Sequence, residues 1–585
     1  MALVFGSTVF ISSVLLFWVQ PMVSKMILPL FGGTPSVWTS CMLFFQIFLL
    51  AGYLYAHLIS VKISSGKQIF VHCFLLLAGV VFLPFAFSDK MVADFSWNSN
   101  PVFLLIGLLV MVVGFPFFIV SASSPLIQKW FSKTSDVSAT DPYFLYAASN
   151  AGSLIAILAY PLLIEPVFPL TIQSKIWALS YRFLVVFFVL IGVITWFSGK
   201  KAGMIKPVPA AEVNSQTAEQ LSIKRILSWI LLAFVPSSLM LGITTHITTD
   251  IASVPLLWVV PLALYLLSFI LVFARKSLIP QGVIEKLFPV FTVVIVFMIL
   301  TEIEKPVWLV FLFFLLFLFI TAMACHGQLS TDRPSPRHLT EYYVFISVGG
   351  ALGGVFNAII SPIIFTHIVE LPLVLVIASI IYKRKRKEGK SKKNTLLDIG
   401  YPIMVGGLTI GLALIVPRIT LEPYQLWMFV IFGIPLFVSY FFIHRPLRFG
   451  LALGAIFMGS LFYPDIYGNV VYANRNFFGY IHVNYDKTGP YHRLFYGTTQ
   501  HGLQFVLPER KGEALAYYHR TGPFGDIYQA YRSNPASHSI AVIGLGIGAM
   551  LSYSAPGQHW TFYEIDPEVV RIAKDSRFFT HWQDG

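Results

Sequence analysis

The residues best placed to do chemistry lie near the end of the chain, in a glycine-rich turn. A run of β-forming residues at 539–543 is followed at once by Gly544-Leu545-Gly546-Ile547-Gly548. Glycines after a buried strand let the backbone approach a ligand, and a following helix N-terminus favours bound anions. Glu564 lies twenty residues after Gly544, near the end of a second expected strand, where a carboxylate can accept hydrogen bonds from ribose hydroxyls. The pattern predicts a nucleoside site for either NAD or S-adenosylmethionine.

The form of this turn narrows the choice of ligand. It lacks the later, third glycine of the dinucleotide fingerprint, which favours an adenosyl compound. Pro567 is typical of the first position of a helix, so Glu564 would stand just before a new helix. A turn with a purely structural role is the competing interpretation.

A second candidate is a pair of ionisable residues in an otherwise apolar stretch. His246 and Asp250 are four residues apart, and on a helix such residues share one face. Ionisable groups at membrane depth are costly and are candidates for function. The pair predicts a proton or cation relay, and the competing interpretation is a polar loop just past the end of a span. Two further segments have simpler explanations: we expect glycine-rich 349–354 to serve close helix packing, and Cys325-His326-Gly327 to belong to a cytoplasmic loop.

The composition indicates that these residues are held by a membrane protein. The chain has 585 residues, of which 56% are hydrophobic and 11% charged, with a mean hydropathy of +0.75. Soluble proteins carry about 25% charged residues, so several soluble domains are excluded, as are disordered and collagen-like chains. The net charge of +13 arises before residue 463, because the tail after it holds ten basic and ten acidic residues. Such charge indicates membrane topology and contact with lipid rather than nucleic-acid binding. The three cysteines form no CxxC pair, so neither a disulfide framework nor a metal site is expected.

Fifteen apolar segments approach the length of about 20 residues that a helix needs to cross a bilayer. They are 4–24, 38–59, 68–87, 101–125, 142–164, 178–197, 226–245, 254–273, 286–301, 306–324, 342–361, 363–382, 399–416, 426–443 and 448–463. The loops after every second segment are basic, which places them and the first residues in the cytoplasm. Fifteen crossings would then leave the tail outside. We expect instead a cytoplasmic tail, with either 286–301 or 448–463 failing to cross.

The fold class expected is an all-α polytopic membrane bundle of 14 to 15 helices, followed by a small β domain and an incomplete Rossmann-like α/β domain of the methyltransferase type. The polar stretch 198–225 divides six spans from the next six, an arrangement similar to that of the major facilitator family. In the tail, β-forming runs at 470–473, 478–484 and 492–495 alternate with turn residues. The expected units are 1–197, a linker 198–225, 226–382, a basic loop 383–398, further helices 399–463, a β-rich subdomain 464–535 and a partial nucleoside-binding domain 536–585.

Four short motifs give the tail a resemblance to the spermidine synthase (polyamine aminopropyltransferase) family. They are Phe495-Tyr496-Gly497-Thr498-Thr499-Gln500, Tyr518-His519-Arg520, 542–548 and Glu564-Ile565-Asp566. The whole chain resembles bacterial membrane proteins in which a transporter-like part is fused to such a synthase. This resemblance implies a multi-pass protein of the bacterial inner membrane whose co-substrate is S-adenosylmethionine or its decarboxylated form, without a metal. It implies transfer of an aminopropyl or methyl group to a small amine, and it allows an oligomer formed through the synthase-like domain.

The resemblance assigns roles to particular positions. Residues binding the adenosyl donor would be Gly544, Gly546, Gly548, Glu564, Asp566 and Gln500. Tyr518 and His519 would bind substrate, and the catalytic acidic residue is expected beyond Gly585.

The chain departs from the family where acidic residues would hold an amine. Those three positions carry Ile547, Arg520 and Tyr496, so nucleoside recognition survives better than amine recognition. The alternative function is a major facilitator-like transporter whose appended domain senses a nucleoside or is a degenerate synthase.

Overall fold

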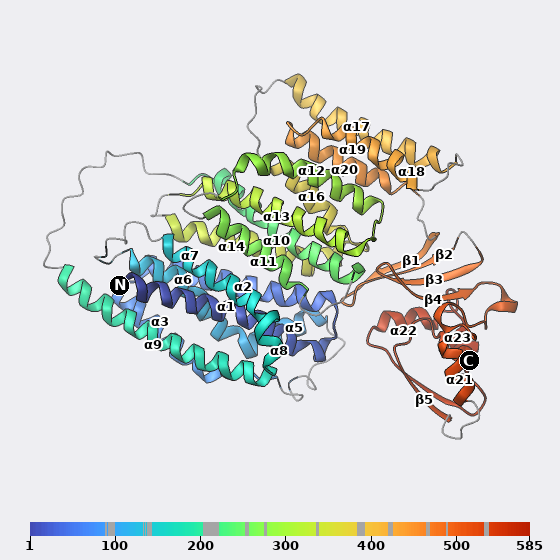
Figure 1. The fold of residues 1–585 in the computed structure, drawn as a ribbon, viewed down its shortest axis with the longest axis horizontal. Helices are drawn as coiled ribbons and strands as arrows, with labels where there is room; N and C mark the ends of the chain where they lie inside the picture. The colour runs from blue at the N-terminus through green and yellow to red at the C-terminus, as the bar shows by residue number, and fades with distance from the viewer. Residues whose placement is uncertain are drawn as a thin grey trace.

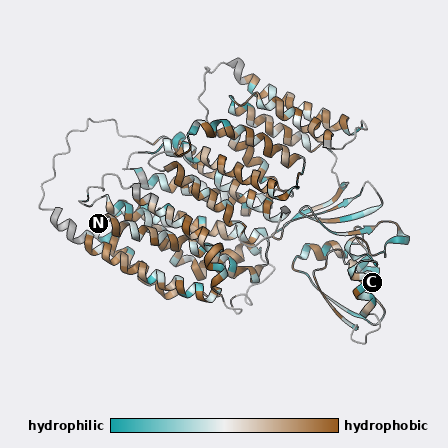
Figure 2. Cartoon of the chain, in the orientation of Figure 1, coloured by the Kyte–Doolittle hydropathy of each residue, from teal (hydrophilic) through white to brown (hydrophobic). Residues whose placement is uncertain are grey.

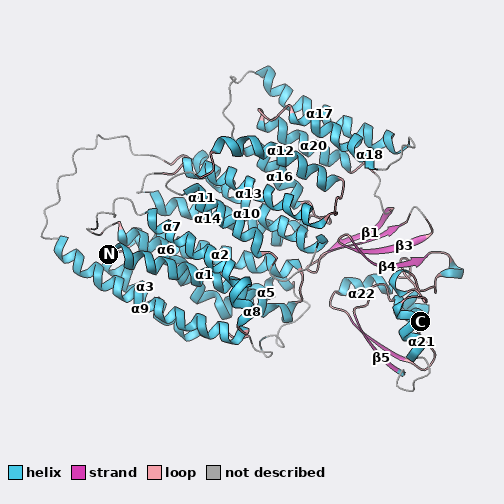
Figure 3. Cartoon of the chain, in the orientation of Figure 1, coloured by secondary structure: helices cyan, strands magenta, loops and turns pink. Residues whose placement is uncertain are grey.

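The computed structural model describes residues 1–87, 91, 100–132, 134, 136, 143–202, 221–251, 257–273, 278–334, 338–382, 392–418, 425–463, 468–486, 489–531 and 538–584. A large helical bundle holds the first four fifths of the chain, and strands occur in the tail (Figure 3). Within the described residues ten helices are long and apolar enough to cross a membrane, and five shorter apolar helices accompany them. A bilayer offers backbone groups no partners, so a helix, which satisfies them internally, is the form expected for each apolar run. The chain is a multi-pass membrane protein.

The first half of the bundle contains six helical units. They are α1 (Ala2–Phe31), α2 (Pro35–Lys62), α3 (Ser65–Gly79), α5 (Pro101–Leu109) continued by η2 (Val110–Gly114) and α6 (Phe115–Phe131), α7 (Tyr143–Ala159) continued by η4 (Tyr160–Ile164) and α8 (Glu165–Val167), and α9 (Leu170–Ala202).

The second half also contains six. They are α10 (Ile223–His246) continued by η5 (Ile247–Ile251), α11 (Val259–Phe273), α12 (Gln281–Leu300), α13 (Val307–Thr331), α14 (Leu339–Val355) continued by η7 (Phe356–Ile360) and α15 (Ser361–Ile364), and α16 (Glu370–Ile381).

The two halves repeat one packing scheme. In the first half α1 packs on α6, α7 and α9, while α3 packs on α6 and α9, and α2 packs on α6. In the second half α10 packs in the same way on α13, α14 and α16, while α12 packs on α13 and α16, and α11 packs on α13. Each of these contacts in the first half has a counterpart in the second half between the units at the same positions in the order. The two halves are therefore a parallel internal repeat of six helices.

The contacts between the halves are reciprocal. The second unit of the first half, α2, packs on the fifth unit of the second half, α14. The fifth unit of the first half, α7, packs on the second unit of the second half, α11. Such reciprocity requires an approximate two-fold axis along the bundle, which is the relation between the halves of major facilitator transporters.

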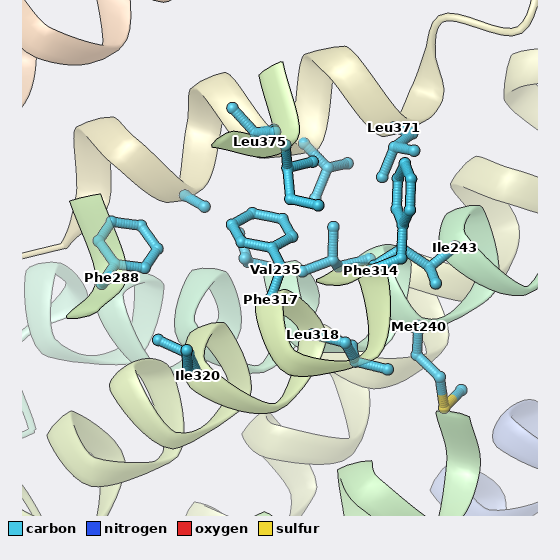
Figure 4. Packing of buried hydrophobic residues seen from close by; sticks show 14 of the residues in the cluster. Val235, Met240, Ile243, Phe288, Phe314, Phe317, Leu318, Ile320, Leu371 and Leu375 are labelled. Carbon is cyan, nitrogen blue, oxygen red and sulfur yellow. The ribbon is translucent and has the colours of Figure 1, made fainter. Parts of the chain in front are cut away.

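The bundle has apolar cores of tightly packed side chains, one in each half. In the second half, side chains of α10, α12, α13 and α16 converge around Val235, Phe314 and Phe317 (Figure 4). The outward-facing side chains are apolar as well, and Figure 2 shows the bundle as predominantly hydrophobic beside a more polar tail. Leu162 and Ile403, for example, are largely exposed, as side chains facing lipid would be.

The glycines of α14 allow it to lie directly against α10. A Cβ at Gly349 would come within 2.3 Å of the carbonyl oxygen of Ile230, and one at Gly353 within 2.9 Å of the amide nitrogen of Ser238. Residues this small let two helix backbones touch. The packing role predicted for 349–354 is confirmed.

Three more helical units follow and attach to the second half. They are α17 (Lys392–Ile415), α18 (Gln425–Met428) continued by η9 (Phe429–Gly433) and α19 (Ile434–Tyr440), and α20 (Pro446–Ser460). α20 packs on α16 and α17, and α19 packs on α12. Asp398 joins α17 to α20 through Arg448, whose Nη2 lies 2.9 Å from the carboxylate.

The tail contains a four-stranded antiparallel sheet and a two-stranded parallel one. The first has the order β1 (Asn469–Arg475), β2 (Tyr480–Tyr485), β3 (Tyr491–Tyr496) and β4 (Thr499–Phe505). The second pairs β5 (Ser539–Ile543) with β6 (His559–Tyr563), and three short helices, α21 (Pro523–Tyr531), α22 (Pro567–Lys574) and α23 (His581–Asp584), complete the tail. The strands expected near 470–473, 478–484 and 492–495 are present, whereas β4 was not predicted.

The tail lies at the end of the bundle opposite to the N-terminus (Figure 1). It touches the last residue of α1 and the first residue of α16, through Phe477 and Arg475 respectively. The helix ends that border the basic loops lie at the other end, where His57 near the end of α2 meets Thr340 at the start of α14. Neither 286–301 nor 448–463 leaves the bundle, because these segments form α12 and α20.

One expected loop is helical. Cys325, His326 and Gly327 lie inside α13 and are buried, because α13 extends to Thr331 rather than ending near residue 324. A helix that continues past its most apolar stretch satisfies its own backbone groups, and the small polar residues of this turn pack against α11 and α12.

Candidate functional site

A cavity of about 170 Å³ lies between the two halves of the bundle. Seven helices line it: α1, α2, α6 and α7 from the first half, and α10, α11 and α14 from the second. Its polar lining residues are Ser12, Ser13, Gln20, Gln46, Tyr53, Ser121, Ser124, Gln128, Ser149, Asn150, Ser153, Tyr265, Tyr343 and Ser347. Among the described residues that line the cavity, none is Asp, Glu, Lys, Arg or His. The cavity therefore offers hydroxyl and amide groups without a net charge.

The first half supplies most of these polar groups, and hydrogen bonds hold several of them in place. Ser149 of α7 lies at the centre: its Oγ is 2.7 Å from Ser13 Oγ of α1 and accepts a hydrogen bond from Ser124 Oγ of α6 at 3.2 Å. Gln128 donates from Nε2 to Ser124 Oγ at 3.2 Å. This Ser13–Ser149–Ser124–Gln128 cluster fixes the direction of four polar side chains at the cavity wall.

The second half contributes a wall of aromatic and small residues. Tyr265 and Phe269 of α11 and Tyr343 of α14 line the cavity. Behind them His326 stacks on Phe269, with ring centroids 3.6 Å apart, and its Nδ1 lies 2.8 Å from Ser268 Oγ. His326 is fully buried, and its Nε2 has no hydrogen-bond partner among the described residues. Sequence reasoning missed this site, because its residues are single serines, amides and aromatics spread over seven helices.

The predicted relay pair is described only in part. His246 packs against Phe314 with ring centroids 4.7 Å apart. The side chain of Asp250 lies outside the described residues, although its backbone belongs to the π-helical turn η5. The relay stays a prediction.

The glycine turn of the tail meets the carboxylate predicted to accompany it. Gly544, Gly546 and Gly548 all have positive φ, at 86°, 56° and 77°. Glu564 Oε2 accepts a hydrogen bond from the amide of Leu545 at 2.8 Å, and its Oε1 accepts one from the amide of Asp566 at 3.0 Å. Each carboxylate oxygen keeps a second lone pair for another donor.

Two features of this turn differ from the expectation. The segment after it is the 3₁₀ helix η13 (Ala549–Tyr553), so no long helix directs its N-terminus at the turn. Ile547 points away from the turn's open side, because it is 1% exposed and packs against Gly502 of β4. An acidic residue at this position would face the core of the tail rather than a bound amine.

Of the other residues predicted to bind the donor, one lies beside the glycine turn and one lies within the four-stranded sheet. Asp566 caps α22, accepting from the amide of Glu568 at 2.9 Å, and also accepts from Asn476 Nδ2 at 2.6 Å. Gln500 accepts a hydrogen bond from Arg493 Nη1 at 2.9 Å, on the neighbouring strand. Asp566 thus lies beside the glycine turn, whereas the described bond of Gln500 holds it within the four-stranded sheet.

Tyr518 and His519 lie in the segment that faces η13. The carbonyl of Tyr518 accepts a hydrogen bond from Tyr553 Oη at 2.6 Å, and its ring packs against the hydrophobic core of the tail. His519 is exposed and lies 2.8 Å from Thr521 Oγ1. Arg520, where the resembling family has a carboxylate, donates to the carbonyl of Ser552 at 3.1 Å and therefore holds η13 in place.

Burial changes the ionisation of groups near the turn. Burial is the main cause that raises the pKa of Asp566, against the hydrogen bonds from Glu568 and Asn476 that lower it. Burial lowers the pKa of His501, with Glu564 opposing the shift. Tyr496 has a raised pKa, mainly through burial and further through the charges of Asp566 and Glu564. These shifts leave His501 and Tyr496 neutral at pH 7, beside two carboxylates.

No protein-family model matches this chain, and no curated protein matches it either. Among solved structures, it is similar to the inward-open form of the xylose transporter XylE from E. coli, with 11% identity and a TM-score of 0.43 over 68% of this chain and all of that one. It is also similar to the peptide transporter POT in complex with alafosfalin, with 14% identity and a TM-score of 0.41 over 65% of this chain and 93% of that one.

Proposed function

We propose that this protein is a transporter of the major facilitator type for a small, uncharged, polar solute. The observation that carries the proposal is the cavity between the two six-helix repeats, which displays hydroxyl and amide groups but no charged side chain among its described lining residues. Alternating access moves one repeat against the other around a site at their interface, and this is where the cavity lies.

The chemistry of the cavity indicates the class of solute. A charged solute entering it would lose its hydration without meeting an opposite charge, which is expensive in an apolar surrounding. A neutral solute with several hydroxyl or amide groups can exchange its hydrogen bonds with water for bonds to the Ser13–Ser149–Ser124–Gln128 cluster. Aromatic rings of Tyr265 and Phe269 would cover its apolar face.

The proposal places the tail outside the cytoplasm. Basic residues gather in the loops at the N-terminal end of the bundle, and the positive-inside rule assigns that end to the cytoplasm. The tail lies at the other end. This position removes the tail from the cytoplasmic supply of S-adenosylmethionine, and it argues for the transporter ahead of the transferase.

Ser149→Leu tests the cavity. Purified full-length protein is heated with glucose, glycerol, a neutral amino-acid amide or the diamine putrescine, and the shift in melting temperature is measured. We expect at least one neutral solute to raise the melting temperature of the wild type and to be taken up by proteoliposomes. Ser149→Leu should abolish both effects, because a leucine fills part of the cavity and removes the central hydroxyl.

Ser132→Leu is the matched control, since Ser132 is exposed at the end of α6 and its hydroxyl donates to the carbonyl of Lys129. It should leave the shift and the uptake unchanged. Stabilisation by putrescine and by no neutral solute would contradict the proposal.

A second candidate function is supported by the contact of Glu564 with the amide of Leu545 at 2.8 Å. We infer from it a site for an adenosyl compound at the glycine turn, with S-adenosylmethionine or its decarboxylated form as the ligand. Transfer of an aminopropyl or methyl group from that ligand remains the prediction of the resemblance.

Glu564→Ala should weaken the binding of S-adenosylmethionine at least tenfold, because the variant loses the acceptor for ribose hydroxyls and loosens the turn. Isothermal calorimetry on the full-length protein measures the affinity. Glu568→Ala is the control, because Glu568 belongs to α22 and pairs with Arg571 instead. Equal affinity in the wild type and Glu564→Ala would remove this site from consideration.

A further inference from the structure

The hairpin formed by β1 and β2 joins the tail to both halves of the bundle. Arg475 donates to Glu370 at the start of α16, with Nη2 at 2.7 Å from Oε1 and Nη1 at 3.0 Å from Oε2. Two residues later, Phe477 packs on Phe31 at the end of α1, with ring centroids 6.5 Å apart. Since α16 belongs to the second half and α1 to the first, this hairpin bridges the two halves.

Each half has a second contact with the tail. The ring of Tyr480 lies 5.2 Å from that of His367, just before α16. On the first half, the side chain of Ile565 lies against Gly32, just after α1. The bridge therefore has two contacts on each side.

The contact with the second half is buried and hydrogen-bonded. Glu370 is 2% exposed and Arg475 is 8% exposed. Ser361 donates a further hydrogen bond to Glu370 at 2.8 Å, and Arg475 donates one to the carbonyl of His367 at 3.1 Å. A bidentate pair held by these further hydrogen bonds fixes both the position and the orientation of the hairpin.

The tip of the hairpin is also held from within the tail. Asn476 Oδ1 accepts hydrogen bonds from the amides of Phe478 and Gly479, at 2.8 and 3.2 Å, while its Nδ2 donates to Asp566. This turn keeps Arg475 and Phe477 presented toward opposite halves. The hairpin is therefore a preformed element rather than a loose connection.

The hairpin covers a second cavity, which we call the outer chamber. It has a volume of about 320 Å³ and lies between the halves at the end of the bundle where the tail docks. Its polar lining residues are Ser36, Thr39, Asn100, Thr245, Asn357, Glu370, Arg475 and Asn476. Both α2 and α10 line this chamber and the central cavity, so the two cavities follow one interface between the halves.

We propose that the β1–β2 hairpin is the outer gate of this interface and that opening it admits solute to the outer chamber. The proposal rests on the transporter function inferred above. When the outer ends of the two halves separate, the hairpin cannot remain bonded to Glu370 and packed on Phe31 at once. One of the two contacts must break, so the hairpin holds the outer end closed until it does.

Cysteine accessibility tests the gate without requiring a known solute. Cys41, Cys73 and Cys325 are replaced by alanine in the full chain, and Thr39→Cys places a thiol in the outer chamber, where Thr39 is 7% exposed. A membrane-impermeant maleimide is added from the side of the tail, and the labelling rate is measured. We expect Phe477→Ala and Arg475→Ala each to raise this rate about tenfold.

Two further variants guard against unfolding as the explanation. Arg510→Ala removes a bidentate pair with Glu513 whose described contacts lie within the tail, and it should leave the rate unchanged. The charge reversal Glu370→Arg with Arg475→Glu restores an ion pair and should return the rate toward that of the background.

The results distinguish the gate from the transporter function on which it rests. Equal labelling in the background, Phe477→Ala and Arg475→Ala would overturn the gate while leaving the solute-binding test of Ser149→Leu intact. Labelling of Thr39→Cys only from the side of the basic loops would also overturn the gate. Faster labelling in both variants, with no neutral solute bound or carried, would support the gate and contradict the transporter.

Discussion

Ile547→Asp is expected to destabilise the tail by about 4 kcal/mol or more. Ile547 is 1% exposed, and its side-chain carbons lie 2.6 to 2.9 Å from the position that a Cβ on Gly502 would occupy. Ile481 and Val483 of the antiparallel sheet and Ile572 of α22 belong to the same core. An unpaired charge in such a place typically costs about 3–5 kcal/mol, and the lost apolar packing adds to this. Hydrogen exchange of the tail in the full-length protein measures the loss.

The substitution also separates two views of the tail. An aspartate belongs at this position in the spermidine synthase pattern, so a pocket of that type would gain affinity for an amine. Ile543→Asp is the matched control: the same change, four residues earlier, at a side chain that is 93% exposed. We expect it to change protection by less than about 0.5 kcal/mol. Unchanged protection in Ile547→Asp together with new putrescine binding would show that the side chain faces a ligand site.

Gly349→Ala is expected to lower the stability of the bundle. The new Cβ would meet the carbonyl oxygen of Ile230 at 2.3 Å and the Cβ of Ala233 at 2.8 Å. The carbonyl is part of the backbone of α10, so the two helices must move apart, and overpacking of this kind costs about 1–3 kcal/mol. Thermal unfolding in detergent, followed by size-exclusion chromatography, should show a lower midpoint.

The neighbouring Gly350→Ala carries the same chemical change with the opposite expected sign. A Cβ there has nothing within 4 Å, and alanine favours a helix over glycine by about 1 kcal/mol. Gly350→Ala should therefore unfold at the same or a slightly higher temperature. Equal losses in both variants would mean that α10 and α14 are not in backbone contact.

The membrane part of the fold was largely predictable, for a physical reason. Lipid satisfies no backbone polar group, so each apolar run had one stable form. All fifteen runs became helical units, and ten helices of the described residues are long and apolar enough to cross a membrane. The tail strands at 539–543 and 560–565 were predictable from their apolar runs in the same way. β4 was not, because Thr499, Gln500 and His501 have little of the apolar alternation that marks a strand.

The candidate sites show where a single sequence loses information. Glu564 was found because the strand and turn that position it are local in sequence. The central cavity was not, since Ser13 and Ser149 meet only after helices far apart in sequence pack together. The pair of Glu370 and Arg475 joins residues 105 positions apart, and each residue alone is typical of an ordinary solvated charge.

The three helices that follow α16 make the molecule asymmetric. α19 and α20 pack on α12 and α16, and they carry the chain into the tail, while no equivalent helices follow the first half before α10 in the described residues. In a rocking motion of one half against the other, the tail would move together with the second half. Arg475 and Glu370 would then stay paired through each transport cycle, and the contact between Phe477 and Phe31 would be the one that breaks.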